Sequence, residues 1–538
     1  MIQAMFARIA RGVRLLLSRL PTDPRVGALR DLLPRPSRGG GAADPLVAVE
    51  CTSDHYFFAL FCALFIELQA RKGARGELIV VRSVNGGIGT GWRESLLRSR
   101  PLGKWLSNQW VRAFRPWIAQ VGYRSLGAMS ASDRREDLRR ADEAWRSWCA
   151  DGATFELDID GIPVGDLIVD SFLRFRPAPR FDPRDRFTLT LMRQAFFDVR
   201  LARAYFRRAR PALFLVSHST YIEHGIAVRV ALAEGVDVRS FGTLARFGKR
   251  LTREDWFHPP NTDNYRSVFE SLDDQPARLQ LAEKGLGFRL SGGIDSAMTY
   301  MRTSAYAASA EVPPEVAGAV VIFMHDFYDS PHIYHDMVFT DFWDWAGFTI
   351  ETLQAAGIPF FLKPHPNQID LSSEALLALR ARFPDMRLLP LGVTNAQLAR
   401  AGMSCGVTMY GSVAHELAYL GVPTIACARH PHHSFTFCRT AKTQEEYRRF
   451  LQTPRELPAS AAEMKRQALA FYYMHNLHGT PEELALRSRS NAFWRVCCDG
   501  SATLDQLARA FDAMRQEPGF GDCAARLLAP RADAPSAS

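Results

Sequence analysis

A short run with two prolines carries residues suited to holding a phosphate group. Lys363, Pro364, His365, Pro366 and Asn367 follow one another directly. The prolines restrict the backbone on both sides of the imidazole, and the lysine is a compact positive charge beside that hydrogen-bond donor. The run therefore predicts a binding site for the phosphate of a ligand. A turn that merely ends a strand is the alternative.

A later run has the pattern of an anion-binding helix start. Gly411 lets the backbone approach a ligand, and Ser412 stands where a helix cap is expected, ahead of amides that attract an anion. Glu416, one turn further on, can accept hydrogen bonds from a ribose diol. With the lysine and histidine run, these residues predict a cradle for a nucleoside monophosphate or diphosphate. For Ser412 alone, simple helix capping is the alternative.

Candidate catalytic groups lie in three other loops. Residues 325–332 hold two carboxylates and two imidazoles, from which we predict His325 and Asp326 as acid–base groups. Sugar binding, metal binding and a structural role for His325 are the alternatives, and metal is the least favoured of them. Asp54 and Glu223 are candidates for deprotonating an acceptor hydroxyl, although either could instead cap a helix.

The cysteines and histidines predict neither a metal nor another cofactor. The nine cysteines are scattered, and none forms the C-x-x-C pair typical of zinc and redox sites. This usage favours a reducing cytosol. A group of histidines after the last predicted strand is expected to form the solvated rim of a loop beside the nucleotide ligand, and not a zinc site: His430, His432 and His433.

Alternating strands and helices are expected to position these residues. The clearer alternation predicts a doubly wound parallel sheet, with strands at 320–324, 359–363, 386–390, 404–409 and 423–428. Ligands bind outside the carboxyl ends of such strands, which is where the runs described above lie. An earlier and less regular alternation predicts a second sheet, with strands at 46–50, 77–82, 212–216 and 236–241. Residues 100–150 read as a helical insertion, and 155–169 as short strands.

We therefore expect an α/β chain with two Rossmann-like domains. We expect a basic arm with a linker (residues 1–44), an acceptor domain with the helical insertion (45–300), a donor domain (315–480), and closing helices with a disordered tail (481–538). The 538 residues are 47% hydrophobic, enough for more than one core. The net charge of +9 is spread along the chain, which indicates anionic partners but not nucleic acid.

The N-terminal arm has the composition of a basic amphipathic helix. Residues 1–22 contain four arginines and no acidic residue, with apolar residues at helical spacing. Reversible contact with an anionic inner leaflet is one prediction, and docking on the protein itself or a transit peptide are the others. The longest apolar run, residues 57–66, is about half the roughly 20 residues needed to cross a bilayer. We expect a cytoplasmic protein that can attach peripherally to the membrane.

The segment Ser291-Gly292-Gly293-Ile294-Asp295-Ser296 resembles the pyrophosphatase loop of ATP-cleaving ligases. That loop needs a buried apolar strand directly before it, so that its amides meet the ATP phosphates. Residues 283–290 contain two glycines and two cations and make a poor central strand. A ligase of this type is therefore only a minor alternative.

Taken together, three motifs carry a family resemblance. Lys363-Pro364-His365-Pro366, Gly411-Ser412-x-x-x-Glu416 and Gly421-x-Pro423 resemble the donor domain of bacterial capsule and surface-polysaccharide glycosyltransferases of the two-Rossmann (GT-B) type. The nearest group is capsule polysaccharide biosynthesis, which includes Kdo transferases; bacterial sialyltransferases are more distant. A looser resemblance covers residues 161–170 and Tyr221-x-x-x-Gly225-x-x-x-Arg229.

The resemblance implies that His365, Pro366 and Ser412 contact the donor phosphate. Members of this family differ in their donors. We predict a metal-independent glycosyltransferase that moves a sugar from a CMP- or UDP-type donor to a growing capsule or other cell-surface polysaccharide. Polyol-phosphate transferases of wall teichoic acid synthesis share a similar His-Pro feature, so transfer of a CDP-glycerol-like group is the alternative.

Overall fold

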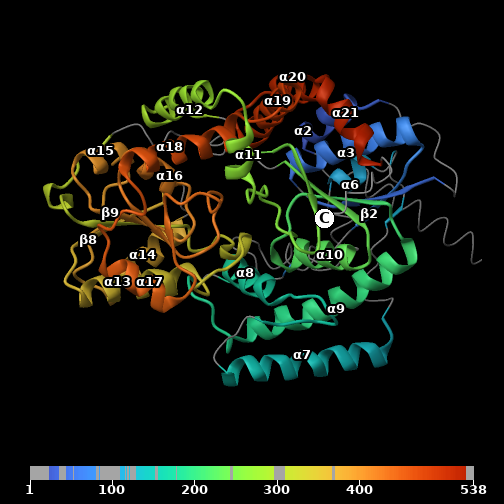
Figure 1. Cartoon of the computed structure of the whole chain (residues 1–538). Coiled ribbons are helices and arrows are strands. Elements are labelled where there is room, and N and C mark those ends of the chain that lie inside the picture. The colour runs from blue at the N-terminus through green and yellow to red at the C-terminus, as the bar shows by residue number, and fades with distance from the viewer. Residues whose placement is uncertain are drawn as a thin grey trace, which may run out of the picture.

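The computed structural model describes residues 23–34, 44–52, 54–79, 84, 109–114, 117, 120–121, 129–151, 156–176, 178–242, 246–295, 309–365 and 370–528. They form two α/β domains, each built around a mainly parallel sheet (Figure 1). The basic arm, nearly all of the linker after it and the tail from residue 529 lie outside the described residues, so their predicted roles stay predictions. No described helix is both long and apolar enough to cross a bilayer.

The first domain contains a six-stranded sheet. Its strands are β1 (Leu46–Glu50), β2 (Arg75–Ile79), β3 (Gln120–Val121), β4 (Leu213–Val216), β5 (Asp237–Phe241) and β6 (Gly248–Leu251). They lie in the order β3-β2-β1-β4-β5-β6, and all neighbours are parallel except β5 and β6. The strand order reverses between β1 and β4, so a ligand crevice is expected at their carboxyl ends.

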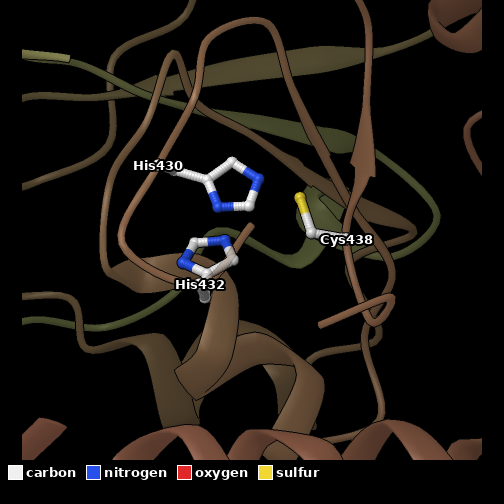
Figure 2. Close-up of side chains that lie close together, drawn as sticks. All are labelled: His430, His432 and Cys438. Atoms are coloured by element: carbon white, nitrogen blue, oxygen red, sulfur yellow. The ribbon is translucent and has the colours of Figure 1, made fainter. Parts of the chain in front are cut away.

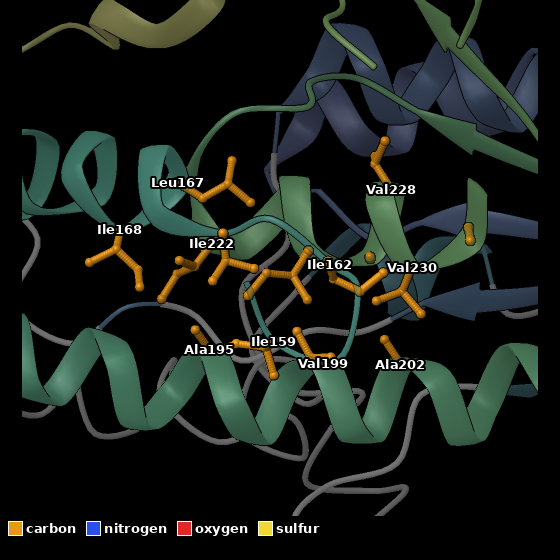
Figure 3. Close-up of a cluster of buried hydrophobic side chains, with 14 of the residues drawn as sticks. Ile159, Ile162, Leu167, Ile168, Ala195, Val199, Ala202, Ile222, Val228 and Val230 are labelled. Carbon is orange, nitrogen blue, oxygen red and sulfur yellow. The ribbon is translucent and has the colours of Figure 1, made fainter. Parts of the chain in front are cut away.

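Helices cover both faces of this sheet. They are α2 (Pro24–Asp31), α3 (His55–Lys72), α6 (Gln109–Phe114), α7 (Ala131–Asp151), α8 (Gly165–Phe175), α9 (Arg186–Ala209) and α10 (Tyr221–Ala233). Successive strand residues point to opposite faces. Ala48 and Phe214 therefore pack with α8, α9 and α10, while Val47 and Leu213 pack with α3. Figure 3 shows part of the first core, including Leu167, Ala195, Val199, Ile222 and Val230.

One predicted strand region of this domain is helical instead. Residues 155–169 were expected as short strands, but the described part makes only a single bridge, between Asp158 and Pro163, before α8 begins. Gly161 has a φ of 84° and turns the chain sharply. Leu167, Ile168 and Phe172 then recur at helical spacing and are buried, so the 3.6-residue period determines the structure.

The second domain contains a five-stranded parallel sheet. Its strands are β7 (Val320–Phe323), β8 (Phe360–Lys363), β9 (Cys405–Val407), β10 (Thr424–Ala426) and β11 (Arg439–Thr440), in the order β11-β10-β9-β7-β8. The strand predicted at 386–390 is reduced to one parallel bridge from Leu388 to Leu362. The order reverses between β7 and β9, so this sheet has a switch point of the same kind as the first.

The helices that follow β7 in the second domain are α13 (Phe342–Ala355), α14 (Asp370–Arg382), α15 (Asn395–Arg400), α16 (Val413–Tyr419), α17 (Gln444–Gln452) and α18 (Ala461–Tyr472). Two further helices of this domain precede its sheet in the sequence. Residues up to 300 were predicted to belong to the first domain. The apolar side chains of α11 (Tyr265–Ser271) and α12 (Gln275–Leu290) nevertheless share a core with α18, and Figure 1 shows α12 beside that helix.

The last three helices return to the first domain. They are α19 (Pro481–Cys498), α20 (Leu504–Arg515) and α21 (Pro518–Leu527). Leu486, Phe493 and Phe511 lie in one core with the apolar residues of α3. Because the chain crosses between the domains before and after the second sheet, the two sheets are held together by continuous, packed chain.

A buried ion pair joins the domains directly. Nδ1 of His332, in the second domain, lies 2.6 Å from Oδ1 of Asp170, on α8 of the first. Both residues are buried. Burial favours the neutral imidazole, but the carboxylates of Asp170, Asp166 and Asp341 outweigh it and raise the pKa of His332 above its ordinary value of 6.5. The pair therefore stabilises the domain contact most when His332 is protonated.

We predict that His332→Gln destabilises the protein more at pH 6 than at pH 8.5. The raised pKa means that the stabilisation by the imidazolium is fully present below pH 6.5 and is lost as the pH rises through the folded-state value. The expected cost at pH 6 is roughly 1.5–3 kcal/mol, the range for a hydrogen bond to a charged group. Urea unfolding of both proteins at both pH values measures it. An equal loss of unfolding free energy at the two pH values would show that His332 is not protonated in this pair.

Candidate functional site

The switch point of the second sheet brings together the loops that follow β7 and β9. His325 follows β7, and its Nε2 lies 3.1 Å from Oγ1 of Thr408, which follows β9. The same hydroxyl oxygen accepts a hydrogen bond from the amide of Gly411, at 3.0 Å. A Cβ at Gly411 would lie 2.7 Å from that oxygen, so this close turn needs glycine.

Lys363 and His365 stand at the end of β8, beside this switch point. Lys363 is only 6% exposed, and burial lowers the pKa of its ammonium group although Glu416 acts to raise it. His365 is half-buried; burial lowers the pKa of its imidazole, Asp326 opposes this change and Lys363 adds to it. These electrostatic couplings place a cation and an imidazole together, as the sequence predicts. Pro366 and Asn367 lie outside the described residues.

The candidate acid–base residues of the β7 loop are held by other protein groups. The His325 ring stacks on Phe342 at 4.7 Å, with 6° between the planes, and also contacts Tyr410. Burial lowers the pKa of His325 to about 3, so its ring is neutral at physiological pH. Oδ1 of Asp326 accepts hydrogen bonds from the Ser372 hydroxyl at 2.6 Å and from a backbone amide. Both residues are therefore well placed to fix the shape of the site.

Ser412 occupies the predicted cap position but makes no side-chain capping bond. It directly precedes α16, a helix of seven residues, and is exposed. Its hydroxyl is not committed to the simple capping role that was the alternative. We therefore keep Ser412 as a proposed contact to the donor phosphate.

Glu416 lies in a buried polar network. It is 1% exposed; its Oε2 accepts a hydrogen bond from Asn395 at 2.7 Å, and its Oε1 lies 3.4 Å from Nη1 of Arg289. A ribose hydroxyl would have to compete with both protein donors. The arrangement favours a second role for Glu416, which is to hold negative charge close to Lys363.

The segment that resembles an ATP-binding loop, residues 291–296, does not have the structural setting that such a loop needs. The preceding element is helix α12 and not a buried strand. Oδ2 of Asp295 accepts hydrogen bonds from Arg289 at 2.7 Å and from the Tyr472 hydroxyl at 2.8 Å, within the network that holds Glu416. The strand that an ATP-cleaving ligase needs is therefore replaced by a helix, and Asp295 has a structural role.

In the first domain, the two predicted base candidates contact backbone amides. Asp54 caps α3, where its Oδ1 accepts from the amide of Phe57 at 3.1 Å. Glu223, in the first turn of α10, accepts a hydrogen bond from the amide of Val84. Asp54 thus has the capping role that was its alternative, whereas Glu223 is not a cap and contacts the backbone of another segment instead.

A carboxylate–imidazole pair at the first switch point was not predicted from the sequence. Glu50, the last residue of β1, accepts a hydrogen bond from Nδ1 of His224 on α10. Its other oxygen accepts from the amide of Ser217 at 2.7 Å and from the Ser217 hydroxyl at 2.6 Å. Burial alone would raise the pKa of Glu50, but His224 and Ser217 outweigh it and lower the pKa to about 2. Glu50 is therefore ionised.

The geometry of this pair suits general-base chemistry. A carboxylate only accepts hydrogen bonds, so Nδ1 of His224 carries a proton, and in the neutral ring Nε2 is the nitrogen with the lone pair. Glu50 is 4% exposed, whereas the side chain of His224 is 22% exposed, so the imidazole is the member that an acceptor can reach. His218 contacts the ring of His224, and His258 contacts the ring of His218. Burial lowers the pKa of His218 to about 4 and the pKa of His258 well below its ordinary value of 6.5, so both rings are neutral.

The domain contact includes residues next to both switch points. The hydroxyl of Tyr410, in the loop after β9, donates to the carbonyl of Ser330 at 3.3 Å. Tyr221, three residues before His224, also makes a side-chain hydrogen bond with Ser330. A single segment of the second domain thus contacts both the loop after β9 and the start of α10, the helix that carries His224.

The histidines after β10 are not the solvated rim that the sequence predicted. His430 and His432 are 1% and 0% exposed, respectively. The loop folds inward because aromatic residues hold it: His432 stacks on Phe437 at 4.9 Å and contacts Phe471. His433 is partly exposed and pairs with Asp263 at 2.8 Å. The prediction of a solvated rim is wrong for His430 and His432.

The fold is therefore of the class with two Rossmann-like domains.

No protein-family model and no curated protein matches the chain. Among solved structures, the UDP-GlcNAc 2-epimerase of Neisseria meningitidis bound to UDP-GlcNAc is 9% identical, with 79% of this chain and 97% of that chain covered and a TM-score of 0.22. Anabaena HepE in complex with UDP and glucose is 12% identical, with coverage of 80% and 95% and a TM-score of 0.26. The glycotransferase of kitacinnamycin is 12% identical, with coverage of 83% and 99% and a TM-score of 0.24. At these TM-scores the similarities assign no activity to this chain.

Proposed function

We propose that this protein is a glycosyltransferase that moves a sugar from a nucleotide-activated donor to a hydroxyl of a glycan. The observation that carries the proposal is the presence of two chemically distinct clusters, one at the switch point of each sheet. The first switch point supplies the Glu50–His224 pair, and the second supplies Lys363 and His365. A base on one side and cations on the other are what transfer from a phosphate leaving group requires.

The proposed reaction uses each cluster once. Nε2 of His224 takes the proton of the acceptor hydroxyl, while Glu50 stabilises the imidazolium that forms. The acceptor oxygen bonds to the anomeric carbon, and the bond from that carbon to the phosphate oxygen breaks. Lys363, His365 and the amides near Ser412 stabilise the negative charge that develops on the leaving phosphate. The electrostatic stabilisation comes from protein groups, so the proposed step needs no metal ion at the phosphate.

The donor and acceptor classes rest on the family resemblance of the three donor-site motifs. We propose a CMP- or UDP-type donor and a growing capsule or other cell-surface polysaccharide as acceptor. The basic arm, residues 1–22, would bring the enzyme to the inner face of the membrane where such an acceptor is built.

Nucleotide binding and product analysis test the proposal. A thermal-shift panel of CMP, CDP, UDP and GDP is expected to show stabilisation by one of them, about 2.7 kcal/mol at a concentration of 100 times the Kd. The matching nucleotide sugar should then yield free nucleotide and a lengthened glycan without a new phosphodiester. A product that retains a phosphodiester would identify polyol-phosphate transfer, and a donor epimerised without any acceptor would contradict transfer. No stabilisation by any nucleotide would also overturn the proposal.

A further inference from the structure

Three potential metal ligands lie together in the core of the second domain, outside the proposed reaction. His430 and His432 are in the loop after β10, and Cys438 directly precedes β11. One ligand atom from each, an imidazole nitrogen or the sulfur, lies within 4.8 Å of the other two. Figure 2 shows the two rings and the thiol turned toward a common space. The three residues are 1%, 0% and 8% exposed.

The imidazoles of this cluster have nitrogen atoms that no protein group satisfies. Among the residues that the structure describes, neither Nδ1 nor Nε2 of His432 has a hydrogen-bond partner, and neither does Nδ1 of His430. Nε2 of His430 lies 2.7 Å from the hydroxyl oxygen of Thr440, which orients that ring. A buried polar group without a partner costs about 1–3 kcal/mol, so several such atoms in one place need an explanation. A bound metal ion would supply the missing partner.

From this geometry we infer that His430, His432 and Cys438 bind a zinc ion. Two imidazoles and one thiolate are a ligand set that zinc accepts, and a fourth position would be left for water. The nitrogen and sulfur atoms need to approach the metal to roughly 2.0–2.3 Å, which small side-chain rotations allow from their present separations. A neighbouring hollow of about 70 Å³, lined in part by His430, has room for a water.

The protonation states of the ligands agree with this role. Burial lowers the pKa of His430 to about 3, so its imidazole is neutral, as a metal ligand must be. Burial raises the pKa of Cys438 to about 12 in the absence of an ion, and zinc binding would release that proton.

The position of the cluster, in the loop between β10 and β11, indicates which part of the fold a zinc ion would hold. The loop that it would fix also carries Arg429, whose guanidinium pairs with Asp263 and whose amide donates to the carbonyl of His335 at 3.0 Å. Zinc would therefore hold the β10–β11 loop in the conformation that makes these contacts. This assignment replaces the sequence-based expectation that no metal binds, and it leaves the proposed transfer step unchanged.

Metal analysis of the full chain, purified without chelators, tests the inference. We expect about one zinc per chain in the wild type and less than a tenth of that in Cys438→Ser. The matched control is Cys427→Ser, which also places a hydroxyl at a buried cysteine position of the same domain but outside the cluster. It should keep its zinc. A strong chelator should lower the Tm of the wild type and of Cys427→Ser but not that of Cys438→Ser.

Cobalt substitution gives a second test that needs no folded variant. Wild-type protein refilled with cobalt should show the visible bands of tetrahedral cobalt together with thiolate-to-cobalt charge transfer. These bands would establish the sulfur ligand directly. Wild-type protein without zinc that also fails to bind added zinc or cobalt would overturn the inference, as would equal zinc contents in the two serine variants.

Discussion

Glu50→Gln is expected to lower kcat by about 10²- to 10⁴-fold, the range that a positioned general base contributes. Glutamine fills almost the same volume but cannot stabilise an imidazolium on His224, and its amide can force the wrong imidazole tautomer. The Ser217 amide still has an oxygen to bond, so the β1 end should keep its shape. Steady-state kinetics with the donor identified by the nucleotide panel gives the measurement.

The matched control for this substitution is Glu77→Gln. Glu77 lies on the neighbouring strand β2 of the same sheet and accepts a hydrogen bond from the Tyr205 hydroxyl at 2.8 Å. Its carboxylate is part of the fold and not of the switch point, so kcat should stay within a factor of about two to three. If Glu50→Gln folds normally and turns over as fast as this control, His224 is not the base.

Lys363→Met is expected to lower kcat/KM for the donor by about 10²- to 10³-fold, as the loss of one preorganised electrostatic contact does. Methionine has a similar length and suits a side chain that is only 6% exposed. Glu416 keeps its hydrogen bond from Asn395 and its contact with Arg289, so the buried network should survive the change. Calorimetry of nucleotide binding separates the loss of donor affinity from the loss of turnover.

Lys442→Met is the control for this second prediction. Lys442 is an exposed lysine of the same domain, so its substitution removes one positive charge without touching the switch point. Donor binding should remain at the wild-type level. Equal binding by Lys363→Met and by this control would show that the ammonium group of Lys363 does not hold the phosphate.

Much of the fold was predictable because its signals are local. Strands such as β1, β4, β7 and β8 are short apolar runs between helix-like segments, and this alternation predicts a parallel sheet. The two-residue strand β11 and the short β6 carry no such signal, because their pairing depends on tertiary context. The return of α19 to the first domain is a long-range packing choice that a local pattern does not encode.

The candidate site was predictable in part for the same reason. Lys363 ends the apolar strand β8 and Gly411 lies in the loop after β9, so topology alone places them at the carboxyl edge. Glu50 carried a related signal, since a carboxylate that ends a buried strand needs a partner. That partner, His224, is far away in sequence, and only the fold brings the two together. The inward loop of His430 and His432 likewise depends on Phe437 and Phe471, whose packing is not visible in the local sequence.

The most direct test of the central claim is the structure of this protein with the nucleotide sugar that stabilises it. We predict a donor phosphate within hydrogen-bond distance of Lys363 and His365, with the anomeric carbon on the side of Nε2 of His224. A nucleotide seated elsewhere would contradict the account, for example in the hollow lined by Lys249 and Arg429.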